Sequence, residues 1–81
     1  MNDKTVQNAY MEIVANQLET GDPPETRATL DRLVAAGHSS SEAMQLMAAV
    51  ARNEMQAMLA AGRLFDNVRF AKLLAKLPEL D

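Results

Sequence analysis

Residues 36–42 read Ala-Gly-His-Ser-Ser-Ser-Glu, and this stretch holds the end of one predicted helix and the start of the next. A glycine just past a helix end adopts the left-handed conformation at low cost, and a serine followed three residues later by a glutamate favours a helix start. Residues 20–25 (Thr-Gly-Asp-Pro-Pro-Glu) and 61–66 (Ala-Gly-Arg-Leu-Phe-Asp) form two similar junctions. Because all three glycines of the 81-residue chain lie at such junctions, the sequence predicts four short helices.

Flanking residues set the expected bounds of these helices. The first is expected from about residue 4 to residue 19, with Asp3 as its cap. The second is expected to begin at Asp22, with Pro23 at its first helical position, and to stop at Gly37. The third is expected over about 41–60. The fourth is expected from its cap, Asp66, to about residue 77, where a proline prevents continuation.

Apolar residues recur at three- and four-residue spacing, which indicates one buried face on each helix. The predicted buried residues of the first helix are Val6, Ala9, Tyr10, Ile13, Val14 and Leu18. Those of the second are Thr26, Leu30, Leu33 and Val34. Those of the fourth are Phe70, Leu73, Leu74 and Leu77, with Phe65 placed to pack on the first turns of that helix.

The predicted third helix has two apolar stripes instead of one. The first comprises Ala43, Leu46, Met47, Val50, Ala57, Met58 and Ala61. The second comprises Met44, Ala48, Ala51, Met55 and Leu59. Since a surface helix usually has a single stripe, this helix is expected to have neighbours on two sides. The sequence therefore predicts a single all-α domain over 1–81, a compact bundle of four mainly antiparallel helices with the third helix central.

Two polar residues interrupt the apolar stripes. Glu54 lies in the first stripe of the third helix, and Gln17 lies in the stripe of the first helix. A buried carboxylate needs hydrogen-bond donors, so Glu54 is expected to accept from Gln17 or Tyr10 in an interhelical polar network. Two alternatives are open: a general base or metal ligand in an interhelical pocket, and a position on an interface between two copies.

Other polar patterns point to chemistry only weakly. The single histidine, His38, follows a helix stop, and the serines after it fit a helix cap better than a catalytic arrangement. Glu42 and Gln45 have the spacing of a di-iron motif, but an amide is a poor iron ligand. The basic residues at 63, 69, 72 and 76 have no interleaved aromatic residues, and the chain is acidic, with a pI near 5.0. Nucleic-acid binding is therefore not favoured.

Composition narrows the protein class. The chain has no cysteine, which removes disulfides and thiolate chemistry and is compatible with a reducing cytoplasm. No apolar run is long enough to span a bilayer, and the first residues do not have the pattern of a signal peptide. The net charge is −3, with a basic excess confined to residues 52–77. A cytoplasmic location without membrane association is expected.

The sequence from about residue 10 to 78 resembles a family of small, all-helical bacterial proteins classed as domains of unknown function. The resemblance lies in residues 16–25, 29–33, 36–38, 42–43, 65–66, 70 and 74–78. Gln17 and Glu54 match the family pattern. Members often carry histidines at the positions of Met11, Ser41 and Gln45, and this chain carries none of them. The resemblance implies no established activity.

These observations favour a non-enzymatic protein–protein interaction module that forms a homodimer and needs no cofactor. The predicted interface is on the second stripe of the third helix, at Met44, Ala48, Met55 and Leu59, or on the outer face of the first helix. The alternative is a metal-binding or enzymatic helical bundle with a pocket around Glu54, Gln17 and Tyr10.

Overall fold

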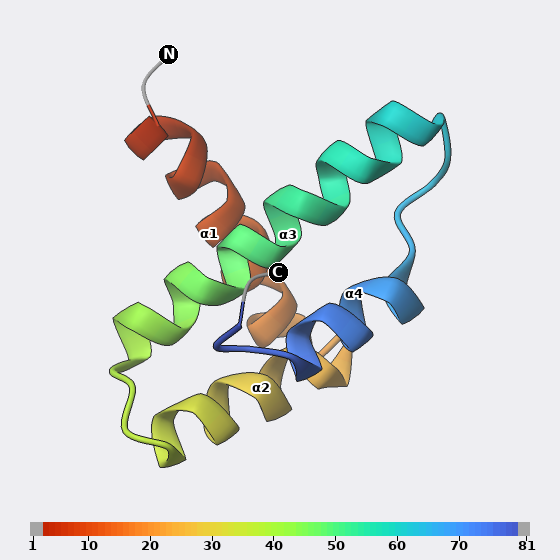
Figure 1. The fold of residues 1–81 in the computed structure, drawn as a ribbon. Helices are drawn as coiled ribbons and strands as arrows, with labels where there is room; N and C mark the ends of the chain where they lie inside the picture. The colour runs from red at the N-terminus through yellow and green to blue at the C-terminus, as the bar shows by residue number, and fades with distance from the viewer. Residues whose placement is uncertain (1–2, 80–81) are drawn as a thin grey trace.

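The computed structural model describes residues 3–79, which form four helices joined by short turns (Figure 1). The helices are α1 (Asp3–Thr20), α2 (Pro24–Ala35), α3 (Ser40–Ala61) and α4 (Asn67–Ala75). No strand occurs between residues 3 and 79. The prediction of an all-α bundle with four helices is confirmed.

Local hydrogen bonds explain where α3 and α4 begin. The Ser39 hydroxyl accepts from the backbone N–H of Glu42 at 3.0 Å, and the Glu42 carboxylate accepts from the backbone N–H of Ser39 at 3.4 Å. This reciprocal pair satisfies two N–H groups that the first turn of α3 leaves without partners. Asp66 caps α4 in a similar way, by accepting from the backbone N–H of Arg69 at 3.1 Å. Both expected caps are confirmed.

Two helix ends differ from the expectation. The N-cap of α2 is Pro23, which is extended, with φ −76° and ψ 151°, while Asp22 is exposed and does not cap the helix. The second proline, Pro24, supplies the first helical φ instead. Helix α4 ends at Ala75, before a tighter turn that brings the chain to Pro78. A proline disfavours helical geometry in the residue before it, so the helix stops earlier.

Helix α3 packs against all three other helices, and Figure 1 shows it crossing α1 near its middle. The buried apolar core contains Val14, Leu33, Ala43, Met47, Ala48, Val50, Ala51, Phe70, Leu74 and Leu77. Five of these ten residues belong to α3, and both of its predicted stripes contribute. The prediction that α3 is the central element is confirmed.

Burial is uneven along the helices. The last turn of α3 extends beyond its neighbours (Figure 1), and Ala61 is exposed, whereas Ala43 and Met47 near its start are buried. On α2, Val34 was expected inside but is 44% exposed. Thr29 is buried in its place, and its hydroxyl donates to the carbonyl of Glu25 at 2.7 Å. The side chains of Asp3 and Val6 lie outside the described part of the chain.

Candidate functional site

Glu54 is fully buried and its carboxylate has four close donors. Nη1 of Arg63 donates to Oε2 at 2.7 Å, and Nε of Arg69 donates to Oε1 at 2.7 Å. The backbone N–H of Asp66 adds a bond to Oε2 at 3.2 Å, and Nη2 of Arg63 a longer one to Oε1 at 3.4 Å. The buried charge is therefore both paired and hydrogen-bonded, which is the condition for keeping it inside a protein.

The prediction that Glu54 accepts hydrogen bonds from Gln17 or Tyr10 is wrong. Within residues 3–79 its hydrogen bonds come from the α3–α4 connection and α4, and none comes from Gln17 or Tyr10. Gln17 instead accepts from the hydroxyl of buried Thr26 at 2.9 Å, a bond between α1 and α2. Tyr10 packs at the edge of the core. The structure thus does not assemble the polar network, or the pocket, predicted for these three residues.

The electrostatics of this cluster keep Glu54 ionised. Hydrogen bonds from Arg63 hold the pKa of the Glu54 carboxyl below its ordinary value, against the opposing effect of burial. In return, the hydrogen bond to Glu54 raises the pKa of Arg63. A carboxylate with a lowered pKa and occupied oxygen atoms is a weak proton acceptor. The Glu54 carboxylate is therefore suited to holding α3 and α4 together.

One sequence signal for this cluster was available. Arg63 directly follows the glycine that ends α3, and Arg69 lies in the first turn of α4. Because only residues 62–66 connect the two helices, both arginines must stay near the end of α3. By sequence they group with Lys72 and Lys76 as the basic residues near the C-terminus. In the structure, two of these four basic residues are bound to Glu54.

A group of exposed apolar side chains lies next to this cluster. Leu59 is 72% exposed, Leu64 is 88% exposed and Val68 is 66% exposed. These three residues, here called the Leu64 face, come from the end of α3, the connection and the first turn of α4. Large apolar residues that stay exposed on consecutive segments of a small protein are typical of an interaction surface.

A hollow of about 330 Å³ is formed in part by Phe65 and Asn67, which are the chain neighbours of Leu64 and Val68. This hollow, here called the Met55 groove, is lined by Ile13, Gln17, Asp22, Pro23, Met55, Phe65 and Asn67. Phe65 is held in place by an edge-to-face contact with buried Phe70, at 5.4 Å between ring centroids. That contact confirms the expected packing of Phe65 on α4 and fixes one wall of the groove.

The residues expected at an interface separate into two groups. Ala48 has no exposed surface, so it is part of the core and unavailable to a partner. Met44 is half-buried and lines a different hollow, between α1 and α3, together with Met11. Met55 and Leu59 remain accessible, in the Met55 groove and on the Leu64 face. The prediction of an apolar surface on the second stripe thus applies only to its C-terminal half.

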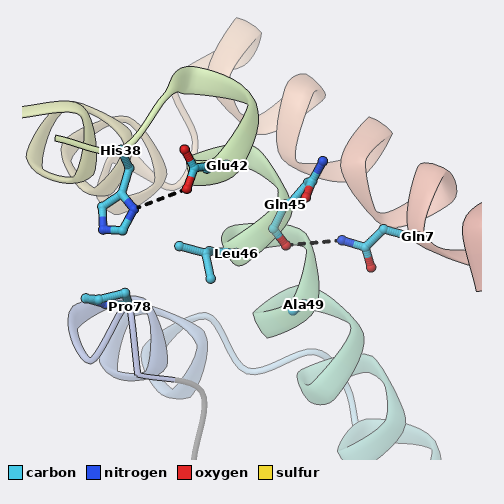
Figure 2. A pocket seen from close by; sticks show the side chains of 7 residues that line it. All are labelled: Gln7, His38, Glu42, Gln45, Leu46, Ala49 and Pro78. Atoms are coloured by element: carbon cyan, nitrogen blue, oxygen red, sulfur yellow. Dashed lines mark hydrogen bonds and ion pairs between the residues drawn. The ribbon is translucent and has the colours of Figure 1, made fainter.

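A second hollow, of about 410 Å³, contains the single histidine (Figure 2). It lies between α3 and the turn at Pro78, and its lining residues are Gln7, His38, Glu42, Gln45, Leu46, Ala49 and Pro78. Nδ1 of His38 is 3.8 Å from the Glu42 carboxylate. The hydrogen bond from the backbone of Ser39 lowers the pKa of Glu42. Since Glu42 already caps α3, this carboxylate serves helix formation.

Among the side chains described, those of residues 7–79, no three histidine, aspartate or glutamate side chains come close enough to hold a metal ion. Of the helices between residues 3 and 79, none is both long and apolar enough to cross a bilayer. Comparisons with family models, curated proteins and solved structures returned no match to this chain. The resemblance to a bacterial family stays a prediction.

Proposed function

We propose that this chain is a non-enzymatic protein–protein interaction module that forms a homodimer in the cytoplasm of a bacterium. The observation that carries the proposal is the Leu64 face beside the Met55 groove, in which Leu59, Leu64 and Val68 are each more than half exposed. The absence of cysteine fits a reducing compartment, and the family resemblance supports a bacterial source.

The energetics support association through this surface. Burying one leucine or valine side chain stabilises a complex by about 1.5–3 kcal/mol. Burial of the three residues of the Leu64 face on both copies contributes on the order of 10 kcal/mol. Association itself costs about 4–15 kcal/mol, so the groove and its polar rim must add to the apolar gain. Subtracting the lower end of that cost from the apolar gain leaves about 6 kcal/mol, which corresponds to a dissociation constant of roughly tens of micromolar.

The Glu54 cluster supports a non-enzymatic role. Its buried carboxylate binds Arg63, which precedes Leu64 in the chain, and Arg69, which follows Val68. The two ion pairs therefore hold the backbone that carries Leu64 and Val68. A surface that is already ordered loses less conformational entropy on binding. The charged residues of the cluster thus hold the Leu64 face in an ordered position for binding.

Sedimentation equilibrium across the micromolar range tests the proposal. We expect the mass to rise from 8.9 kDa toward twice that value as concentration increases. Leu59→Glu and Leu64→Glu should each keep the protein monomeric, because a charge would be buried at the contact. Their circular dichroism should match that of the parent chain, since both side chains are exposed.

Val34→Glu is the matched control, because Val34 is also an exposed apolar residue but lies on α2, away from the Leu64 face. This variant should dimerise as the parent does. A single 8.9 kDa species of the parent chain at all these concentrations would exclude the homodimer.

A further inference from the structure

Leu64 is the most exposed of the large apolar residues between residues 7 and 79, yet its backbone is firmly held. Nη1 of Arg63 donates to the Leu64 carbonyl at 3.0 Å and to Oε2 of Glu54 at 2.7 Å. The backbone N–H of Asp66 is also bound to Glu54. The connection therefore presents the Leu64 side chain to water as a fixed projection.

The Met55 groove offers the complementary shape. Its floor and walls include Ile13, Pro23, Met55 and Phe65, all apolar. Its volume, about 330 Å³, is near the lower end of the range found for ligand pockets. The groove therefore suits one aliphatic side chain and the short backbone segment that carries it.

The exposed Leu64 side chain and the Met55 groove belong to neighbouring parts of the same molecule. Leu64 precedes Phe65, a groove wall, and Val68 follows Asn67, which lies at the groove edge. Leu59 is about one turn beyond Met55 on α3. When a convex and a concave apolar surface adjoin, a two-fold axis between them lets two copies fill each other's groove. A second copy of this chain can thus fill the Met55 groove with its own Leu64.

We propose that Leu64 of each copy inserts into the groove formed by Ile13, Met55 and Phe65 of the other copy, giving a two-fold dimer with two equivalent contacts. This inference rests on the proposed homodimerisation and defines its geometry.

Polar groups at the edges fit the same arrangement. The bond from Thr26 fixes the Gln17 carbonyl oxygen, which leaves the Gln17 amide nitrogen to donate to a backbone carbonyl of the inserted segment. Asp22 gives the groove an acidic edge. Lys72 is exposed one turn beyond Val68 on α4, so it can meet the Asp22 carboxylate of the other copy.

Thiol cross-linking in the full chain tests this geometry, because the protein has no cysteine of its own. Chains carrying Leu64→Cys are mixed in equal amounts with chains carrying Asp22→Cys, and oxidised glutathione is added. Each chain then has one thiol, so any mixed disulfide joins two molecules. Both positions are exposed, and the two variants should fold normally. A third variant, Ile13→Cys, probes the groove wall from α1.

Ser41→Cys is the control partner for Leu64→Cys. It is exposed near the start of α3, about 27 Å along the helix from Leu59 at 1.5 Å per residue. We expect the disulfides with Asp22→Cys or Ile13→Cys to form at least tenfold faster than the disulfide with Ser41→Cys. Mass spectrometry of the linked peptides identifies each pair.

The outcomes separate this inference from the function on which it rests. Equal rates for the groove and control positions, in a protein that sediments as a dimer, would overturn the inserted-Leu64 geometry and leave the homodimer standing. A protein that stays monomeric would overturn both. Fast cross-linking between two Leu64→Cys chains would place Leu64 at the two-fold axis and would also overturn the geometry.

Discussion

Nε of Arg69 lies 2.7 Å from Oε1 of Glu54, although the two residues are fifteen positions apart in the chain. Arg63 occupies the other carboxylate oxygen from the connection between α3 and α4. One buried carboxylate thus joins the second half of α3 to the segment that follows it. Because this segment carries Leu64, the ion cluster and the exposed apolar surface form a single structural unit.

Replacing Glu54 should be costly. Glu54→Ala removes the common acceptor and leaves two arginines without their partner. The loss stays below that of a fully buried pair, because the Arg69 side chain is 53% exposed and can be rehydrated. We expect the free energy of unfolding to fall by about 2 kcal/mol. In thermal denaturation this corresponds to a Tm lower by roughly 10 °C.

Glu54→Gln tests whether charge or shape is essential. The amide keeps one acceptor oxygen but presents N–H donors to an arginine, so it should lose most of the stability lost in Glu54→Ala. A Glu54→Gln protein as stable as the parent would show that the charge contributes nothing.

The same cluster predicts how stability depends on pH. The folded state lowers the pKa of Glu54 from its ordinary value of 4.5. A lowered folded-state pKa stabilises the fold fully above pH 4.5 and loses this contribution as pH falls through the folded-state value. Urea denaturation of the parent and Glu54→Gln should therefore show a stability gap at pH 7 that narrows below pH 4.5. A gap of constant size across this range would contradict the assignment.

Arg32 supplies a second tie to α4. Its Nη1 donates to the carbonyl of Leu77 at 2.9 Å, in the turn after α4, and its Nη2 donates to the carbonyl of Leu74 at 3.0 Å, in the last turn of α4. Arg32→Ala should destabilise the fold by about 1 kcal/mol. It should also speed hydrogen exchange in the last turn of α4.

Arg27→Ala is the matched control for Arg32→Ala, since Arg27 lies on the same helix in an exposed pair with Asp31 at 3.6 Å. An exposed pair of this kind stabilises little, so the control should unfold like the parent. If the two variants behave alike, the tie from Arg32 to α4 has no energetic importance.

The serines at the start of α3, residues 39–41, should respond differently to mutation. Ser39→Ala removes the hydroxyl that accepts from the Glu42 backbone, which should cost about 1 kcal/mol. Ser41→Ala removes an exposed hydroxyl inside the helix and should be neutral or slightly stabilising, because alanine is the best helix former. Thermal melts of both variants decide this, and equal Tm values would contradict the assigned cap.

Most of the fold follows from signals within a few residues of each helix end. Gly62 adopts the left-handed conformation with φ 63°, and Ser39 and Asp66 cap the helices that follow them, as their neighbours in sequence predict. The apolar stripes also identify α3 as central. Val34 shows the limit of periodicity, because it has the spacing of a buried residue but is 44% exposed.

The partners of Glu54 and the accessible part of the second stripe were beyond such reasoning. Periodicity identified Glu54 as a buried carboxylate but did not indicate from which side its donors come. Ala48 and Leu59 share a stripe, yet one is fully buried and the other is 72% exposed. The difference depends on where neighbouring helices end along α3.

The amino-acid sequence alone determined where the four helices begin and end, to within a few residues, and which of them is central. These properties come from backbone capping and side-chain periodicity, which act over one or two helical turns. Only the tertiary structure decided which donors meet Glu54 and where apolar side chains stay in water. Those properties depend on the path of the chain after Gly62, which brings Arg63 and Arg69 back to the side of α3.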